Sequence, residues 1–168
     1  MTPAPIIVTA LFGAADHRFL DDLRRAHFPP ERNQLAAHLT LFHHLPPSLL
    51  EELHGRLKAA TAQPAPAARL VGPMSLGRGT ALRVDCGALA AIRSDLAAAF
   101  AGMLTPQDAG GWRPHVTVQN KVDPPAAKAL LAHLSAEAWP RPLAIAGLAA
   151  WWYRGGPWEA IREYRFRG

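Results

Sequence analysis

The sequence predicts a fold that mixes β-strands with α-helices, arranged as one domain made of two similar lobes. The chain has 168 residues, enough for one compact domain, and 49% of them are hydrophobic, enough for a core. Apolar spacing indicates the order strand, helix, strand, helix, strand in each half, with one extra strand at the end. The tripeptide His-x-Thr recurs at His38 and His115, whose numbers differ by 77. These observations predict an internal repeat, with halves at about residues 5–77 and 80–166 of a single domain that spans 1–168.

The spacing of apolar residues sets the expected elements. Alternation indicates strands, and a recurrence every three to four residues indicates helices. A Phe-Pro-Pro run at 28–30 ends the first helix, and Gly-Arg-Gly-Thr at 77–80 predicts a hairpin turn between the halves. Strands are expected at 5–12, 37–45, 69–76, 81–86, 113–122, 143–153 and 158–166, and helices at 16–27, 47–57, 89–103 and 124–134.

Charge and cysteine content limit the classes of partner. The formal net charge is +5 and the sequence pI is about 10.1, a mild preference for an anionic partner such as a nucleotide or RNA. The single cysteine, Cys86, excludes an internal disulfide and a zinc site built on several thiolates, so a cytoplasmic location is expected. Segment 5–12 is apolar but too short to cross a bilayer, so no membrane contact is expected. We predict a monomer that needs no cofactor.

The two His-x-Thr strands each place an imidazole and a hydroxyl on one face. Side chains alternate along a strand, so His38 lies beside Thr40 and His115 lies beside Thr117. The opposite face of each strand is apolar and anchors it to the core. Two lobes that face each other would therefore bring both pairs together across a cleft.

Such a site suits attack on a phosphodiester. Histidine has an unperturbed pKa of about 6.5, so one imidazole can act as a base while another acts as an acid. The base would deprotonate a water or a ribose hydroxyl, and the acid would protonate the departing oxygen. The threonine hydroxyls would donate hydrogen bonds to the non-bridging phosphate oxygens. His38, Thr40, His115 and Thr117 are therefore the predicted catalytic residues, and this scheme requires no metal ion.

Aromatic residues supply candidates for base stacking. Alternation places Phe42 and His44 on the face of the first motif histidine and leaves His43 on the opposite face. Phe42 is therefore predicted to bind substrate by stacking on a base. Trp151 and Tyr153 are further candidates, although packing is the commoner role of an aromatic run.

At these residues the sequence resembles the two-histidine (2H) phosphoesterase superfamily, and within it the 2′-5′ RNA ligase-like family. Segments 38–42 and 114–118 carry the resemblance, and the duplicated plan extends it over nearly the whole chain. The resemblance implies an α+β fold, bilobal, with a duplicated β-α-β-α-β order and two antiparallel sheets flanking a central cleft, helices outside. It also implies hydrolysis, or reversible formation, of 2′,3′-cyclic phosphates or 2′-5′ bonds at RNA ends or on small nucleotides.

One position departs from the family pattern. Members of the family often carry an arginine five residues after the second histidine, where this sequence has Asn120. Lys121 follows, and alternation places it on the face of the second motif histidine, so it is predicted to supply the missing cation and to bind substrate. Arg83 is a further candidate for a phosphate contact, with a solvated surface role as the alternative. Arg113 leaves the same two roles open.

Two other classes of function remain open. A binding protein could retain the cleft and recognise cyclic nucleotides or RNA ends without catalysis. A hydrolase could use a metal held by His38, His43 and His44, although adjacent residues of a strand point apart and no carboxylate motif completes such a set. The residues alone leave open which motif histidine is the base. The resemblance favours His115 as base and His38 as acid.

Overall fold

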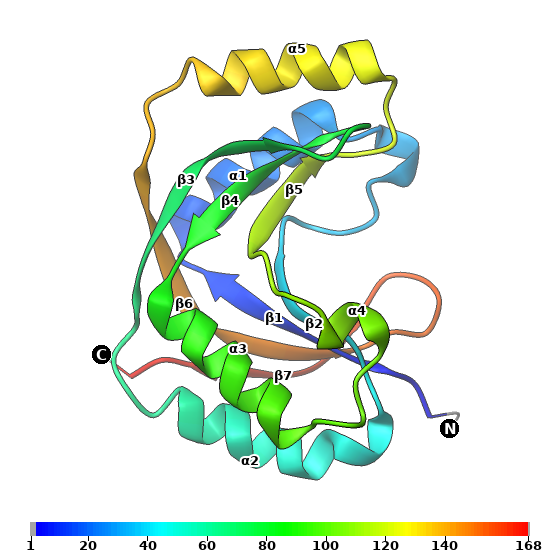
Figure 1. The fold of residues 1–168 in the computed structure, drawn as a ribbon, viewed down its shortest axis with the longest axis vertical. Helices are drawn as coiled ribbons and strands as arrows, with labels where there is room; N and C mark the ends of the chain where they lie inside the picture. The colour runs from blue at the N-terminus through cyan, green and yellow to red at the C-terminus, as the bar shows by residue number, and fades with distance from the viewer. Residues whose placement is uncertain (1–2, 168) are drawn as a thin grey trace.

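A computed structural model describes residues 3–167. Figure 1 shows their arrangement as strands and helices in a single curled structure. The strands are β1 (Ile6–Phe12), β2 (Leu39–Leu45), β3 (Ala67–Ser75), β4 (Thr80–Asp85), β5 (His115–Gln119), β6 (Arg141–Trp152) and β7 (Glu159–Arg165). The α-helices are α1 (Ala14–His27), α2 (Leu50–Ala60), α3 (Gly87–Ala99), α4 (Pro106–Ala109) and α5 (Pro124–Ser135).

The strands pair antiparallel in the order β2-β1-β6-β3-β4-β5, with β7 also paired to β6. β6 takes part in two ladders. Its residues 141–144 pair with β3, and its residues 145–152 pair with β1. The sheet therefore consists of two antiparallel parts, β2-β1-β6-β7 and β3-β4-β5, that are joined through β6. This arrangement confirms the predicted α+β class.

The third strand of each predicted half belongs to the sheet of the other half. With 5–77 and 80–166 taken as halves, β3 of the first half pairs with β4 of the second. In the same way, β6 of the second half pairs with β1 of the first. Gly79 allows the β3–β4 hairpin to lie against the end of β5, because a Cβ there would overlap the carbonyl oxygen of Gln119. The Val122 N–H donates to the Arg78 carbonyl at 3.0 Å, which joins this hairpin to the segment that follows the second motif strand.

The helices lie around the outside of the sheet (Figure 1). α1 packs against β5, α5 packs against β3 and β4, and the short α4 contacts β2. α2 and α3 lie together at the opposite end of the molecule from α5 (Figure 1). Within residues 3–167, no helix combines the length and the apolar character that a membrane crossing requires.

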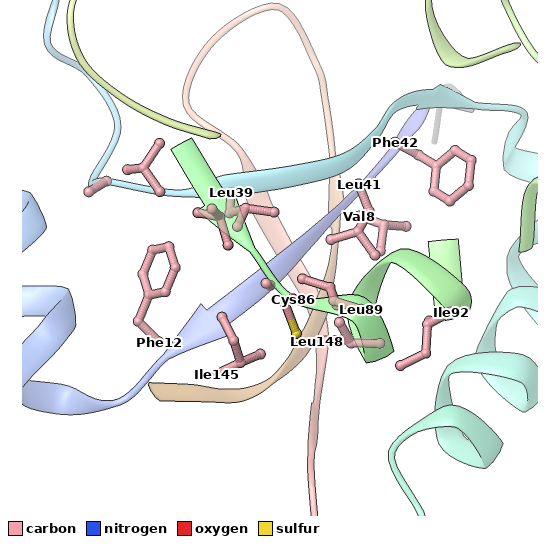
Figure 2. Close-up of a cluster of buried hydrophobic side chains, with 14 of the residues drawn as sticks. Val8, Phe12, Leu39, Leu41, Phe42, Cys86, Leu89, Ile92, Ile145 and Leu148 are labelled. Atoms are coloured by element: carbon pink, nitrogen blue, oxygen red, sulfur yellow. The ribbon is translucent and has the colours of Figure 1, made fainter. Parts of the chain in front are cut away.

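A continuous hydrophobic core lies between the sheet and these helices. β1 is buried along almost its whole length, as expected for a strand with neighbours on both sides. Figure 2 shows Leu39, Leu41 and Phe42 of β2 in the buried cluster, together with Leu89 of α3. Most of β2 is therefore committed to packing, and the first motif is anchored by the side chains that alternate with it.

Candidate active site

The structure brings the two His-x-Thr pairs together in one cavity. His38 lies one residue before β2, and His115 is the first residue of β5. Both imidazoles line a cavity of about 320 Å³, together with Thr40 and Thr117. We call this cavity the two-histidine cleft. Its lining residues are His38, Thr40, His43, Arg93, Gln107, Asp108, Gly111, Trp112, Arg113, His115, Thr117 and Trp158.

Both motif imidazoles are oriented by the same kind of hydrogen bond. His38 Nδ1 lies 2.8 Å from the carbonyl oxygen of Ala36, and His115 Nδ1 lies 2.6 Å from that of Arg113. A carbonyl oxygen can only accept, so Nδ1 carries the proton and donates in both rings. Nε2 is then the ring nitrogen that each histidine can offer to a ligand. Two rings with the same fixed tautomer can exchange protons with a substrate at defined positions.

The environment of His38 favours its neutral form. Burial lowers the pKa of His38 to about 4, and the nearby charges of Arg24, His43 and His115 act in the same direction. The hydrogen bond to the Ala36 carbonyl opposes this shift without cancelling it. The ring also packs edge-on against Trp158, with ring centroids 4.7 Å apart. Near neutral pH, His38 is therefore an uncharged imidazole.

A β-bulge in β2 overturns the prediction for Phe42. In the β1–β2 ladder, Thr9 lies opposite Thr40 and Val8 lies opposite Phe42, so Leu41 is an extra residue. Leu41 and Phe42 are consequently both turned into the core, and Phe42 is 0% exposed. Base stacking by Phe42 is wrong, because this ring is covered by protein on all sides.

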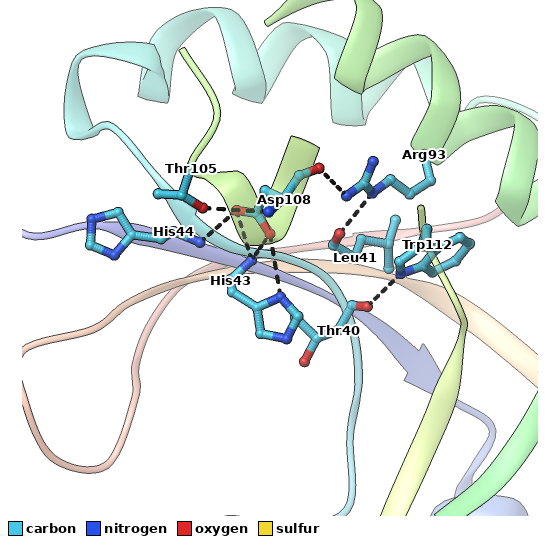
Figure 3. Close-up of polar contacts among 8 residues, drawn as sticks. All are labelled: Thr40, Leu41, His43, His44, Arg93, Thr105, Asp108 and Trp112. Atoms are coloured by element: carbon cyan, nitrogen blue, oxygen red, sulfur yellow. Dashed lines mark hydrogen bonds and ion pairs between the residues drawn. The ribbon is translucent and has the colours of Figure 1, made fainter. Parts of the chain in front are cut away.

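The bulge also reverses the predicted orientations of the two histidines that follow Phe42. His43, expected on the apolar face, lines the two-histidine cleft, whereas His44, expected on the cleft face, is exposed elsewhere. Figure 3 shows the His43 ring on the same side as Thr40 and the His44 ring pointing away from it. The set of three histidines considered for a metal site is thus not assembled. Across residues 3–167, no group of three or more His, Cys, Asp or Glu side chains is placed to share a metal ion.

Asp108 of α4 binds the main chain directly after the bulge, where the β1–β2 register shifts a second time. Its carboxylate, 1% exposed, accepts hydrogen bonds from the backbone N–H groups of His43 and His44, each at 2.9 Å (Figure 3). His43 Nδ1 also donates to it at 3.3 Å. Burial raises the pKa of Asp108, but the hydrogen bonds from His43 and His44 outweigh burial, so the pKa lies below its usual value. Asp108 is therefore a carboxylate that fixes the tautomer of His43 and leaves Nε2 for a ligand.

Two buried arginines attach helices to the motif strands. Arg93 of α3 donates from Nε to the Leu41 carbonyl at 2.9 Å and from Nη2 to the Asp108 carbonyl at 2.6 Å. Its guanidinium also covers the Phe42 ring, 4.1 Å from the centroid. Arg24 of α1 donates from Nη1 to the Thr117 carbonyl at 3.0 Å. Each arginine thus connects a helix of one half to the motif strand of the other half.

The predicted substrate-binding cations lie outside the two-histidine cleft. β5 ends at Gln119, so the expected alternation does not reach Lys121, whose φ of 60° places it in a turn. Lys121 is exposed and lines a neighbouring cavity instead. Arg83 lies directly opposite His115 in the β4–β5 ladder, so its side chain leaves the sheet on the same face as His115 and is exposed. Arg113 does line the cleft.

Other aromatic residues lie near the cleft. Trp158 follows the turn between β6 and β7, and its ring lies between His38 and Trp151. Trp151 donates from Nε1 to the Thr9 hydroxyl at 2.9 Å, so it is held in place by the strand beneath it. Tyr153 is 41% exposed and lines the same neighbouring cavity as Lys121. Trp158 therefore contacts a motif histidine, a position that sequence spacing did not predict.

Comparisons with known proteins identify the family. The model of the 2′-5′ RNA ligase superfamily matches residues 12–157. Among solved structures, TT0787 of Thermus thermophilus is 15% identical with a TM-score of 0.68, covering 98% of each chain. LigT of E. coli in complex with 3′-AMP is 17% identical with a TM-score of 0.66, covering 99% of this chain and 100% of LigT. A protein described as a phosphoesterase is 18% identical with a TM-score of 0.62, covering 99% of this chain and 100% of its own.

At these identities the solved structures establish the shared fold, and no curated protein matches the chain. The family model is more informative, because it spans most of the sequence and includes both His-x-Thr motifs. This protein belongs to the 2′-5′ RNA ligase superfamily, within the two-histidine phosphoesterases.

Proposed function

We propose that this protein is a metal-independent phosphoesterase that opens 2′,3′-cyclic phosphates, or cleaves 2′-5′ bonds, at RNA ends or on small nucleotides. The observation that carries the proposal is the matched pair of imidazoles in one cavity, each fixed through Nδ1 and each beside a threonine hydroxyl. General acid–base catalysis needs two proton-transfer groups on either side of the reacting phosphate. The complex of E. coli LigT with 3′-AMP supports a nucleotide as the ligand of this fold.

We assign the general base to His38 and the general acid to His115. The neutral His38 ring takes a proton from water through Nε2, and the water oxygen forms a bond to phosphorus. The bond from phosphorus to one ribose oxygen breaks, and that oxygen takes a proton from His115 Nε2. Thr40 and Thr117 donate hydrogen bonds to the non-bridging oxygens, whose charge grows in the transition state. The resemblance favours the reverse assignment, and the low pKa of His38 is the reason for preferring this one.

The pH dependence of kcat/KM distinguishes the two assignments, because this ratio reports the ionisation of the free enzyme. With His38 as base, we expect kcat/KM to rise with pH through about 4, since deprotonation of His38 creates the active form. With His38 as acid, kcat/KM would fall above the same pH. Histidine Cε1–H resonances followed by NMR should give the same midpoint for His38. A bound phosphate should raise that midpoint, because a nearby anion favours the imidazolium.

The same pKa shift affects stability. The folded pKa of His38, about 4, is below the value of about 6.5 for an unperturbed histidine. Between these values the unfolded chain binds more protons than the folded protein. His38 therefore contributes less to stability as pH falls through this window. Urea unfolding of the wild type and of His38→Gln at pH 7 and pH 5 should show a smaller loss on acidification for the variant.

Hydrolysis of nucleoside 2′,3′-cyclic phosphates in excess EDTA tests the proposed activity. We expect conversion to one monophosphate isomer by ³¹P NMR, because acid and base lie at fixed positions and determine which oxygen leaves. Activity that disappears in EDTA and returns with zinc or manganese would contradict the metal-independent scheme. Binding of cyclic nucleotides without turnover would instead identify a binding protein.

A further inference from the structure

A second cavity adjoins the two-histidine cleft. It has a volume of about 470 Å³, and we call it the lateral pocket. His43 and Trp158 line both cavities, so these two side chains form the boundary between them. A ligand held in the cleft can therefore extend past His43 and Trp158 into the lateral pocket without crossing the core.

The lateral pocket carries positive charge that its own lining does not balance. Arg24, Arg32 and Lys121 line it, and its described lining residues include no aspartate or glutamate. A larger groove of about 750 Å³, also lined by Trp158 and by His38, has a different character. In that groove two of the cations are paired with acids that also line it, Arg25 with Asp21 at 3.5 Å and Arg165 with Glu163 at 3.0 Å. Of these two neighbours of the cleft, the lateral pocket is the better match to an anion.

Buried contacts hold part of this positive surface in a fixed position. Arg24 is 4% exposed, and it is fixed by hydrogen bonds to the Asn33 side chain at 2.8 Å and to the Thr117 carbonyl at 3.0 Å. The Lys121 backbone N–H donates to the Asn120 side chain at 2.9 Å, which stabilises the turn that carries the lysine. Arg24, whose side chain is fixed, loses little entropy when a ligand binds.

His43 connects the two cavities chemically. Its Nδ1 donates to the buried Asp108, so Nε2 is the nitrogen that can reach a ligand at the boundary. An imidazole that carries a proton on this nitrogen donates a hydrogen bond to a phosphate oxygen. Consecutive phosphates of a nucleic-acid strand are separated by one nucleoside, and two adjoining cavities that share a wall suit such a pair.

We infer that the lateral pocket is a second phosphate subsite that binds the phosphate preceding the reacting one, with Arg32, Lys121 and His43 as contacts. The inference rests on the proposed function and specifies its substrate class: RNA ends of two or more nucleotides, in preference to mononucleoside cyclic phosphates. Arg24 contributes charge from beneath the pocket. Lys121 thus acts at the neighbouring phosphate rather than at the scissile one.

The direct test compares two probes that differ by one phosphate, adenosine 3′-monophosphate and adenosine 3′,5′-bisphosphate, by calorimetric titration at pH 7. The wild type should bind the bisphosphate more tightly by about tenfold or more, as a charge-assisted contact with phosphate provides. The double variant Arg32→Ala/Lys121→Ala should lose most of this preference. The double variant Lys58→Ala/Lys128→Ala removes the same charge from exposed positions on α2 and α5 and should retain it.

Equal affinity of the wild type for both probes would overturn the inference. A preference for the bisphosphate that survives in Arg32→Ala/Lys121→Ala would also overturn it. Loss of the preference in the control variant would overturn it as well, because that result would show a general effect of charge. A parallel assay separates this inference from the proposed function. Hydrolysis of mononucleoside and dinucleotide cyclic phosphates at equal rates refutes the subsite alone, whereas no hydrolysis of either refutes the activity and leaves the binding comparison as the test of the subsite.

Discussion

Replacement of His38 or His115 by alanine is expected to lower kcat/KM for a 2′,3′-cyclic phosphate by about 10²–10⁴-fold, the usual contribution of a general acid or base. Each variant removes the imidazole that transfers a proton at its side of the phosphate. Melting temperature should change little, because both imidazoles line a cavity and the core lies on the other face of the sheet. Steady-state kinetics and circular dichroism on the same preparations would measure both effects.

His44→Ala is the matched control for this experiment. His44 lies in the same strand as Thr40 but points away from the two-histidine cleft, so activity should stay close to that of the wild type. Thr40→Ala and Thr117→Ala should cost less than the histidine variants, because each removes a hydrogen bond rather than a proton carrier. Loss of activity in His44→Ala as large as that in His38→Ala would contradict the assignment of the catalytic pair.

Asp108→Ala is expected to cause a large loss of stability, about 2–4 kcal/mol. The substitution leaves the backbone N–H groups of His43 and His44 without their acceptor, and each unsatisfied donor costs roughly 1–3 kcal/mol when buried. Urea denaturation monitored by tryptophan fluorescence would give the change. Asp108→Asn keeps one oxygen as an acceptor and should lose less. Asp85→Ala, which removes an exposed carboxylate paired with Arg69, should change stability by well under 1 kcal/mol.

The contribution of Asp108 should also depend on pH. Its pKa in the folded protein is below the usual value, so the folded state favours the carboxylate. This contribution is complete above the unfolded pKa and is lost as pH falls through the folded one. The difference in stability between wild type and Asp108→Asn should therefore shrink under strongly acidic conditions. A difference that does not change with pH would show that the carboxylate charge is unimportant at this site.

The duplicated pattern of the sequence was sufficient to predict the strands, the main helices and the meeting of both motifs. Strand alternation and helical spacing are local properties, and a tripeptide repeated at His38 and His115 needs only equivalent positions to converge. The predicted strand over 113–122 was too long, since β5 stops at Gln119. Beyond Gln119 the chain turns, so strand alternation does not predict the orientation of the Lys121 side chain.

The bulge in β2 explains why Phe42 and His43 were misplaced. Strict alternation requires one apolar residue in every two, but Leu41 and Phe42 are adjacent and both apolar. That break in the pattern was a usable signal of a bulge. The partner that binds the main chain directly after it was not predictable, because Asp108 comes from a distant loop whose short helix has no apolar periodicity.

The sequence contains a signal for the two buried arginines. Arg24 lies four residues after Leu20, and Arg93 lies four residues after Leu89, so both share the apolar faces of their helices. An arginine at such a position must find acceptors in the interior. Which carbonyls it would meet depends on how the two halves pack, and this cannot be read from either helix alone.

The path of β6 through both parts of the sheet limits how the molecule can move. Its residues 141–144 pair with β3 and its residues 145–152 pair with β1, so a bend at this junction keeps both ladders intact, whereas a bend elsewhere in β6 breaks main-chain hydrogen bonds. Within the sheet, relative movement of the two parts is therefore confined to this one point.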